Sequence, residues 1–133
     1  MRLIVGAALL VVSPGLFAGE LEPFKGYSGA QLFQRFCASC HGPSGYGDGP
    51  VADSLKVAIP DLTQLAKRSG GRFPGDRVRE IIDGRAVLPA HGNRPMPVWG
   101  YELEAQVPSD QPARATAQGL IDKLVDHLQS IQR

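Results

Sequence analysis

The sequence contains few cysteines, little net charge and no long apolar run, and each shortage argues against a class of protein. Two cysteines among 133 residues are too few for a disulfide-dense mini-protein. A formal net charge of +1 argues against nucleic-acid binding by bulk electrostatics, which usually requires a strong basic excess. The longest run of apolar or small residues, 3–12, spans only about half of the roughly 20 residues that cross a bilayer. With 43% hydrophobic residues, the chain is expected to form one globular domain.

Glycine and proline are abundant instead, with 16 and 11 residues. A regular bundle or sheet of this length needs fewer turn-forming residues, and no stretch shows the convincing alternation of polar and apolar residues that indicates a strand. The composition therefore predicts an all-α, loop-rich fold in which a few short helices surround another group.

Residues 1–18 have the form of a secretory signal peptide. Arg2 supplies a positive charge, residues 3–12 supply an apolar stretch, and Ala18 is a small residue at the expected cleavage site. An uncleaved membrane anchor is the alternative. We expect cleavage after Ala18, export to the periplasm, and a single domain over residues 19–133 with no transmembrane span.

Capping residues and apolar spacing predict four helices. Ser28 and Gln31 form the pattern of a capping box, and Gly84 follows an apolar stripe as a stop signal. The last of the four helices carries the strongest apolar stripe. The expected helices are residues 28–38, 60–68, 74–84 and 113–132, and the expected loops are residues 42–60 and 85–108.

The segment Cys37-Ala38-Ser39-Cys40-His41 contains both cysteines and has the C-x-x-C-H form of a covalent haem attachment site. Two thiols three positions apart at the end of a helix face the same way, so each can add to one vinyl group of a haem. The adjacent His41 is then placed below the ring with its imidazole directed at the iron. The motif predicts one covalently attached haem c with His41 as an axial ligand.

Three other interpretations of the two cysteines remain. A thioredoxin-like redox pair would require a βαβ pattern, which the sequence lacks. A structural zinc site would need further ligands, for which only His91 and His127 are available. A disulfide in an exported protein is chemically reasonable but leaves the adjacent His41 without a role.

Met96 is the first candidate for the second axial ligand. It is the only methionine that remains after removal of the signal peptide, and Pro95 and Pro97 restrict the loop that presents it. A thioether opposite histidine stabilises ferrous iron and raises the reduction potential. The alternatives are His91 as the ligand, a vacant sixth position, or a methionine that only packs in the core. His127 lies within the last helix and is expected to pack there.

These features resemble those of class I c-type cytochromes, in the small bacterial single-haem branch, from Ser28 to Ile131. The family uses a proline carbonyl to accept the Nδ1 hydrogen of the proximal histidine, and the resemblance assigns this role to Pro50. In the family, a glycine and an aromatic residue of the first helix cross the last helix. Besides the attachment motif, the similar segments are the Gly29 and Phe33 pair, Gly45 to Pro50, Pro60 to Thr63, and Met96 to Gly100.

The resemblance implies a class I cytochrome c fold wrapped around one haem, and a monomeric one-electron carrier rather than an enzyme. Its expected partners are a dehydrogenase as donor and an oxidase or reductase as acceptor. Other possibilities are a ligand-binding or sensor haem protein with an open sixth site, and a cytochrome subunit of a larger enzyme complex. The residues expected to form the haem pocket or core are Phe33, Ile81, Ile82, Trp99, Leu124 and Leu128.

Two features depart from the family pattern. The last helix usually carries an aromatic residue about where His127 stands, so its crossing with Phe33 is expected to pack differently. Residues 101–116 are long and polar. They fit either an insertion that shapes a docking surface or a loose connector.

Overall fold

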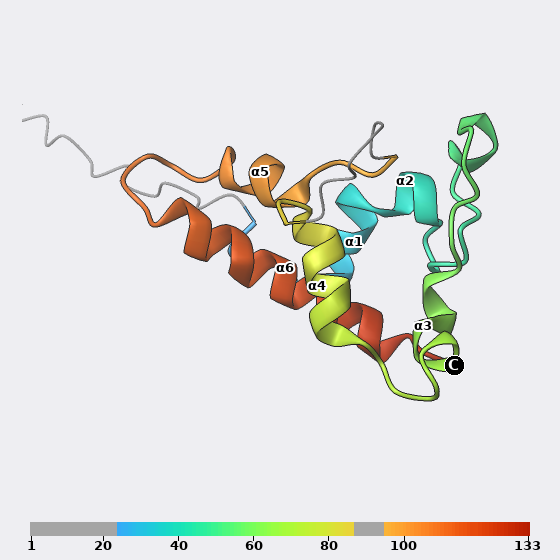
Figure 1. Cartoon of the computed structure of the whole chain (residues 1–133). Coiled ribbons are helices and arrows are strands. Elements are labelled where there is room, and N and C mark those ends of the chain that lie inside the picture. The colour runs from blue at the N-terminus through green and yellow to red at the C-terminus, as the bar shows by residue number, and fades with distance from the viewer. Residues whose placement is uncertain (1–23, 87–94) are drawn as a thin grey trace, which may run out of the picture.

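The described residues of the computed structural model, 24–86 and 95–133, fold into helices joined by loops (Figure 1). No strand occurs in these two ranges, and the predicted all-α class is confirmed. The predicted signal peptide and His91 lie outside the described residues. The helices are α1 (Gly29–Phe36), α2 (Ala38–His41), α3 (Leu65–Arg68), α4 (Gly75–Asp83), α5 (Trp99–Glu104) and α6 (Ala113–Ser130), and 3₁₀-turns form at Ala52–Ser54 and Leu62–Gln64.

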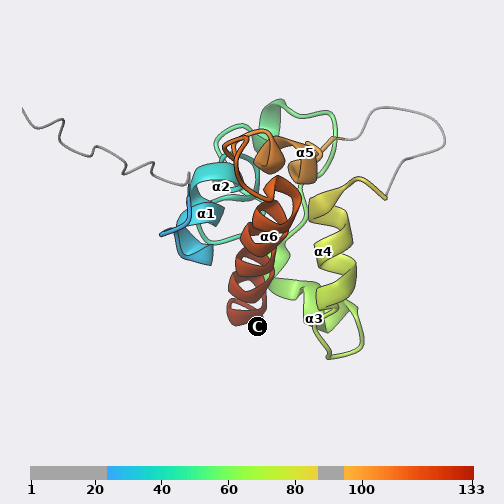
Figure 2. The same ribbon diagram turned by 90° about the vertical axis from the view of Figure 1, so that its left-hand side faces the viewer.

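Helix α6 is the element against which α1, α4 and α5 pack. Figure 2 shows it between α1 and α4, and it also contacts α5. Its buried side chains recur three and four positions apart, which is the apolar stripe expected from the sequence. They are Ala117, Leu120, Ile121, Leu124, Val125 and Leu128, and they share one core with Leu32 and Phe33 of α1, Val78 and Ile82 of α4 and Leu103 of α5.

Helix α1 begins where the capping box predicts. The backbone amide of Gln31 donates to Ser28 Oγ at 3.2 Å, and the backbone amide of Ser28 donates to the side-chain Oε1 of Gln31 at 2.8 Å. The helix ends at Phe36, two residues earlier than expected. Cys37 joins it directly to α2, so the cysteine motif begins at the end of one helix and continues in the next.

Gly29 and Phe33 lie where α1 crosses α6, as the family resemblance implied. A Cβ atom on Gly29 would overlap the carbonyl oxygen of Lys123 and would come within 2.9 Å of the His127 Cβ. The Phe33 ring packs on the His127 ring at a centroid distance of 5.2 Å. The histidine therefore takes the packing position that an aromatic residue usually has in the family.

We expect Gly29→Ala to lower the free energy of unfolding by about 3 kcal/mol, the upper part of the usual range for overpacked sites. The added methyl group meets backbone, which no side-chain rotation can move. Gly119→Ala on α6 is the control, because nothing lies within 4 Å of a Cβ at that position. Alanine there should raise the free energy of unfolding by up to about 1 kcal/mol. Urea unfolding measures both, and a Gly29→Ala variant as stable as the parent would contradict the close crossing.

Helix α5 corrects the expectation that residues 85–108 form only a loop. The six residues Trp99–Glu104 are helical although no side chain caps their N-terminus. An isolated helix of this length is unstable in water, so α5 depends on its tertiary contacts. Leu103 is only 1% exposed and belongs to the core shared with α6. The start of the polar segment 101–116 is therefore packed structure rather than a loose connector.

Gln132 ties the C-terminal end of the chain to the start of α3. Its Nε2 donates to the Leu62 carbonyl at 2.8 Å, and its Oε1 accepts from the Ala66 amide at 2.8 Å. The Asp61 carboxylate caps the same segment by accepting from the Thr63 hydroxyl and amide, and these bonds lower the pKa of Asp61. Together these contacts fix a stretch of backbone that borders the site described next.

Candidate haem-binding site

The cysteine motif is held by a loop that folds back over the end of α2. Cys37 lies between α1 and α2, while Cys40 and His41 belong to α2. The last carbonyl groups of a helix have no partner within it. Amides of the following loop supply the partners here: Gly47 donates to His41 at 2.8 Å, Gly49 to Cys40 at 3.2 Å and Val51 to Ser39 at 3.1 Å. The glycine-rich segment thus fixes the backbone of the motif.

One apolar cavity of about 560 Å³ brings the predicted anchors and ligands together. Cys37, Cys40 and His41 border it from α1 and α2, and Met96 and Trp99 border it from the segment that leads into α5. A cavity of this size is typical of sites for small molecules and cofactors. Its apolar walls include all the other residues expected to form the pocket or core, namely Phe33, Ile81, Ile82, Leu124 and Leu128.

The cavity also has a wall that the sequence analysis missed. Leu55, Val57 and Ile59 come from the stretch 42–60, whose composition indicated only a loop. Leu55 and Val57 are 37% and 40% exposed, and Ile81 of α4 is 39% exposed. Exposed apolar side chains around one cavity are typical of a site that a bound group covers. Their alternating positions are the pattern that could have identified this wall.

Burial sets the protonation of two donor groups. Burial, together with the neighbouring Cys40, raises the pKa of the Cys37 thiol to about 12. Burial lowers the pKa of His41, against an opposing effect of the Pro60 carbonyl. Both cysteines are free. At neutral pH the site therefore presents a protonated Cys37 thiol and a neutral imidazole, which is the form of histidine that binds metals.

The imidazole of His41 has a buried nitrogen without a hydrogen bond. Within residues 24–86 and 95–133, Nδ1 is buried and no partner satisfies it. The backbone group that acts on the pKa of this ring is the carbonyl of Pro60, a residue that also borders the cavity. Pro50 is exposed and does not border the cavity. The structure therefore places Pro60, and not the expected Pro50, beside the imidazole.

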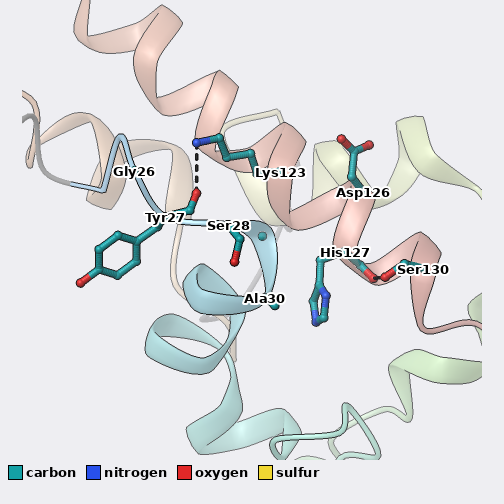
Figure 3. A pocket seen from close by; sticks show the side chains of 9 residues that line it. Gly26, Tyr27, Ser28, Ala30, Lys123, Asp126, His127 and Ser130 are labelled. Atoms are coloured by element: carbon teal, nitrogen blue, oxygen red, sulfur yellow. Dashed lines mark hydrogen bonds between the residues drawn. The ribbon is translucent and has the colours of Figure 1, made fainter.

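A shallow groove at the start of α1 contains none of the predicted ligands (Figure 3). It is bordered by residues 26–30 and by α6. Lys123 Nζ donates to the carbonyl groups of Lys25 and Tyr27 at 2.9 and 3.1 Å, so the ammonium group ties the two segments together. Burial lowers the pKa of His127, whose ring lies against Phe33. This groove follows the crossing of α1 and α6, and His127 packs there as expected.

Two free thiols, a half-buried imidazole and a thioether border one apolar cavity, and this donor set fits a covalently held haem. Thiols bond to haem vinyl groups, and histidine with methionine is an axial pair that haem iron accepts. No group of three histidine, cysteine, aspartate or glutamate side chains able to hold a metal ion occurs in the described ranges. The fold and the donor set are those of a c-type haem protein.

The Cytochrome c family model matches residues 27–117 of the chain. This range covers more than half of the sequence and includes both the cysteine motif and Met96, so the chain belongs to the cytochrome c family. No significant match was found among curated proteins or among solved structures. Family membership makes the chain a haem-based electron carrier with covalently bound haem c and protein redox partners. None of the helices in the described part of the chain is long and apolar enough to cross a membrane.

Proposed function

We propose that the chain is a periplasmic carrier of single electrons that binds one haem c through Cys37 and Cys40, with His41 and Met96 as axial ligands. The observation that supports this most strongly is that all four side chains border the same apolar cavity. Met96 is 55 residues away from His41 in the sequence. Their convergence therefore does not follow from the local cysteine motif. Residues 1–18 supply the export signal that a periplasmic carrier requires.

The two cysteines would anchor the haem without an oxidant. Each thiol adds across one vinyl group, so that the sulfur bonds to one vinyl carbon and the thiol hydrogen goes to the other. The loop amides that bind the carbonyl groups of residues 39–41 fix the backbone there and so keep the Cys40 sulfur and the His41 imidazole at a fixed position relative to each other. Bound haem supplies one-electron exchange between ferric and ferrous iron, and the side chains orient it and tune its potential.

Pro60 is our candidate for the residue that orients His41. A histidine ligand that donates its second ring hydrogen to a carbonyl has a fixed ring plane and a more basic ligating nitrogen. Three observations support Pro60. Its carbonyl group raises the pKa of His41 against the effect of burial, and the imidazole Nδ1 is buried without another partner. In addition, the cap formed by the adjacent Asp61 restrains the backbone. This assignment replaces Pro50.

Met96 would complete the coordination of the iron on the distal side. It is partly buried against the core, and the prolines on both sides of it restrict the backbone. Trp99, the first residue of α5, packs its ring on the Phe36 ring at a centroid distance of 5.4 Å, and this contact anchors the chain three residues after Met96. A neutral thioether in an apolar cavity disfavours the extra charge of ferric iron. We therefore expect a reduction potential in the upper part of the c-type range.

We further propose that the protein works as a monomer and catalyses no reaction itself. Its donor would be a dehydrogenase, and its acceptor an oxidase or a reductase. The exposed apolar side chains of Leu55, Val57 and Ile81 border the cavity. They are the natural place for a partner to approach the haem, because an apolar patch can be desolvated at little cost.

The optical spectrum of the exported protein tests this function. We expect sharp c-type bands after reduction by dithionite, and a weak far-red methionine–iron band in the oxidised form. Sharp bands without the far-red band would keep the haem but contradict Met96 as the ligand. The absence of haem bands, in a host able to attach haem, would overturn the proposal and return attention to the disulfide and zinc interpretations.

A further inference from the structure

Arg85 joins the end of α4 to α5 through two ion pairs. Its Nη2 lies 2.6 Å from Asp83 Oδ1, and its Nη1 lies 2.5 Å from Glu104 Oε2. Only 10% of the Arg85 side chain is exposed, whereas Arg77 and Arg79, which form ion pairs on the same helix, expose 59% and 44%. The side chains of its partners Asp83 and Glu104 are 23% and 35% exposed, so both pairs are only partly accessible to solvent. Exposed ion pairs contribute little to stability, and the contribution grows as the pair is shielded from water.

Helix α5 lies directly on this ion-pair cluster. A Cβ atom on Gly100 would overlap the Asp83 carboxylate and would lie 2.7 Å from Arg85 Nε. The Arg85 guanidinium also lies 5.7 Å from the centre of the Tyr101 ring. Glu104 is the last residue of α5. The contacts of Arg85 therefore run from the first turn of the helix to its end.

A short connection joins Met96 to α5. The helix has six residues and no side-chain cap, so its place is set by tertiary contacts rather than by its own stability. Met96 precedes α5 by three residues, and Pro97 between them leaves the connection little rotational freedom. A shift of α5 away from α4 would therefore move the Met96 thioether relative to the cavity.

We propose that Arg85 is a positioning residue for the distal ligand: by pairing with Asp83 and Glu104 it keeps α5 against α4 and so holds Met96 in place as a ligand of the iron. This inference rests on the proposed function, in which Met96 binds the iron. When Arg85 is lost, both carboxylates lose the guanidinium group with which they pair. Their repulsion then favours separation of α5 from the end of α4.

The test uses the holoprotein with Arg85→Met, which keeps an unbranched apolar stem and removes the charged guanidinium group. Carbon monoxide binds ferrous haem only after the methionine leaves, so its binding rate reports the fraction of molecules with Met96 detached. We expect a rate about tenfold or more above that of the parent, because the variant loses charge-assisted hydrogen bonds that favour the attached state. On heating the ferric form, the far-red band should disappear at a lower temperature than the helical circular-dichroism signal.

Arg79→Met is the matched control. Arg79 lies on α4, which ends shortly before Arg85, and pairs with Asp122 of α6 at 2.6 Å. Its loss therefore also removes an interhelical ion pair but leaves α5 untouched. Its carbon monoxide rate should equal that of the parent, and its far-red band should disappear together with the helical signal. Arg85→Lys should recover only part of the effect, because lysine keeps the charge but cannot pair with both carboxylates in the planar geometry of arginine.

The outcomes separate this inference from the function on which it rests. A parent protein without a far-red band contradicts Met96 ligation and with it the role of Arg85. A parent with the band, together with an unchanged rate in Arg85→Met or an equal increase in Arg79→Met, overturns the role of Arg85 alone. If Arg85→Met does not fold, Glu104→Gln decides, because it removes one of the two pairs. A faster rate in that variant supports the proposal, and an unchanged rate overturns it.

Discussion

Replacing Met96 with alanine should leave the haem attached, abolish the far-red band of the ferric protein, and lower the reduction potential by on the order of 0.1 V or more. The reason is that a thioether favours ferrous over ferric iron, and that preference is lost with the ligand. Cys37, Cys40 and His41 are unchanged in this variant. Attachment should therefore proceed as in the parent, and the ferrous form should bind carbon monoxide rapidly. Redox titration and optical spectroscopy of the purified protein measure these effects.

Two further substitutions at this position separate ligation from packing. Met96→Leu keeps an apolar side chain of similar size, so the change in packing should cost less than about 1.5 kcal/mol while the far-red band still disappears. Met96→His supplies a stronger ligand, which should keep carbon monoxide out and lower the potential. If Met96→Ala has the same reduction potential as the parent, a residue other than Met96 binds the iron. His91 is then the first to test.

The sequence predicted those helices that are marked by a local capping pattern or by a periodic apolar stripe. The capping box at Ser28 placed the start of α1, and the apolar stripe placed α6 together with the buried residues that face the core. Helix α5 could not be predicted in this way, because it is short and uncapped. It exists through contacts of Leu103 with the core and of Glu104 with Arg85, which are distant in the sequence.

In the candidate site, too, the residues in local patterns could be predicted from the sequence, whereas those that depend on the path of the chain could not. The cysteine motif is a local pattern, so its spacing alone indicated the haem anchors and the first ligand. Met96 was inferred because it is the one methionine left in the expected mature chain. The choice between Pro50 and Pro60 depended on how the loop folds back over α2, and composition carries no information about that path. For the same reason, the cavity wall at Leu55 and Val57 was missed.

Replacing both Cys37 and Cys40 with alanine should abolish covalent haem attachment and leave no folded, coloured protein. The cavity has a volume of about 560 Å³, and an empty apolar cavity costs about 24 cal/mol per Å³, which gives an upper bound of about 13 kcal/mol. That cost is comparable to the whole stability of a typical domain, about 5–15 kcal/mol. Without the haem the fold should therefore lose most of its helical circular-dichroism signal.

Single substitutions and a neighbouring control make the result specific to the thiols. Cys37→Ala or Cys40→Ala leaves one thioether and one intact vinyl group, whose conjugation with the ring should shift the absorption bands to longer wavelength. Ser39→Ala changes the exposed residue between the two cysteines and should give a normal spectrum, because the bond from the Val51 amide to residue 39 uses the backbone carbonyl. A folded apoprotein from the double variant would show that the protein fills the cavity by itself. A double variant that retains haem after denaturation would show that the cysteines are not the anchors.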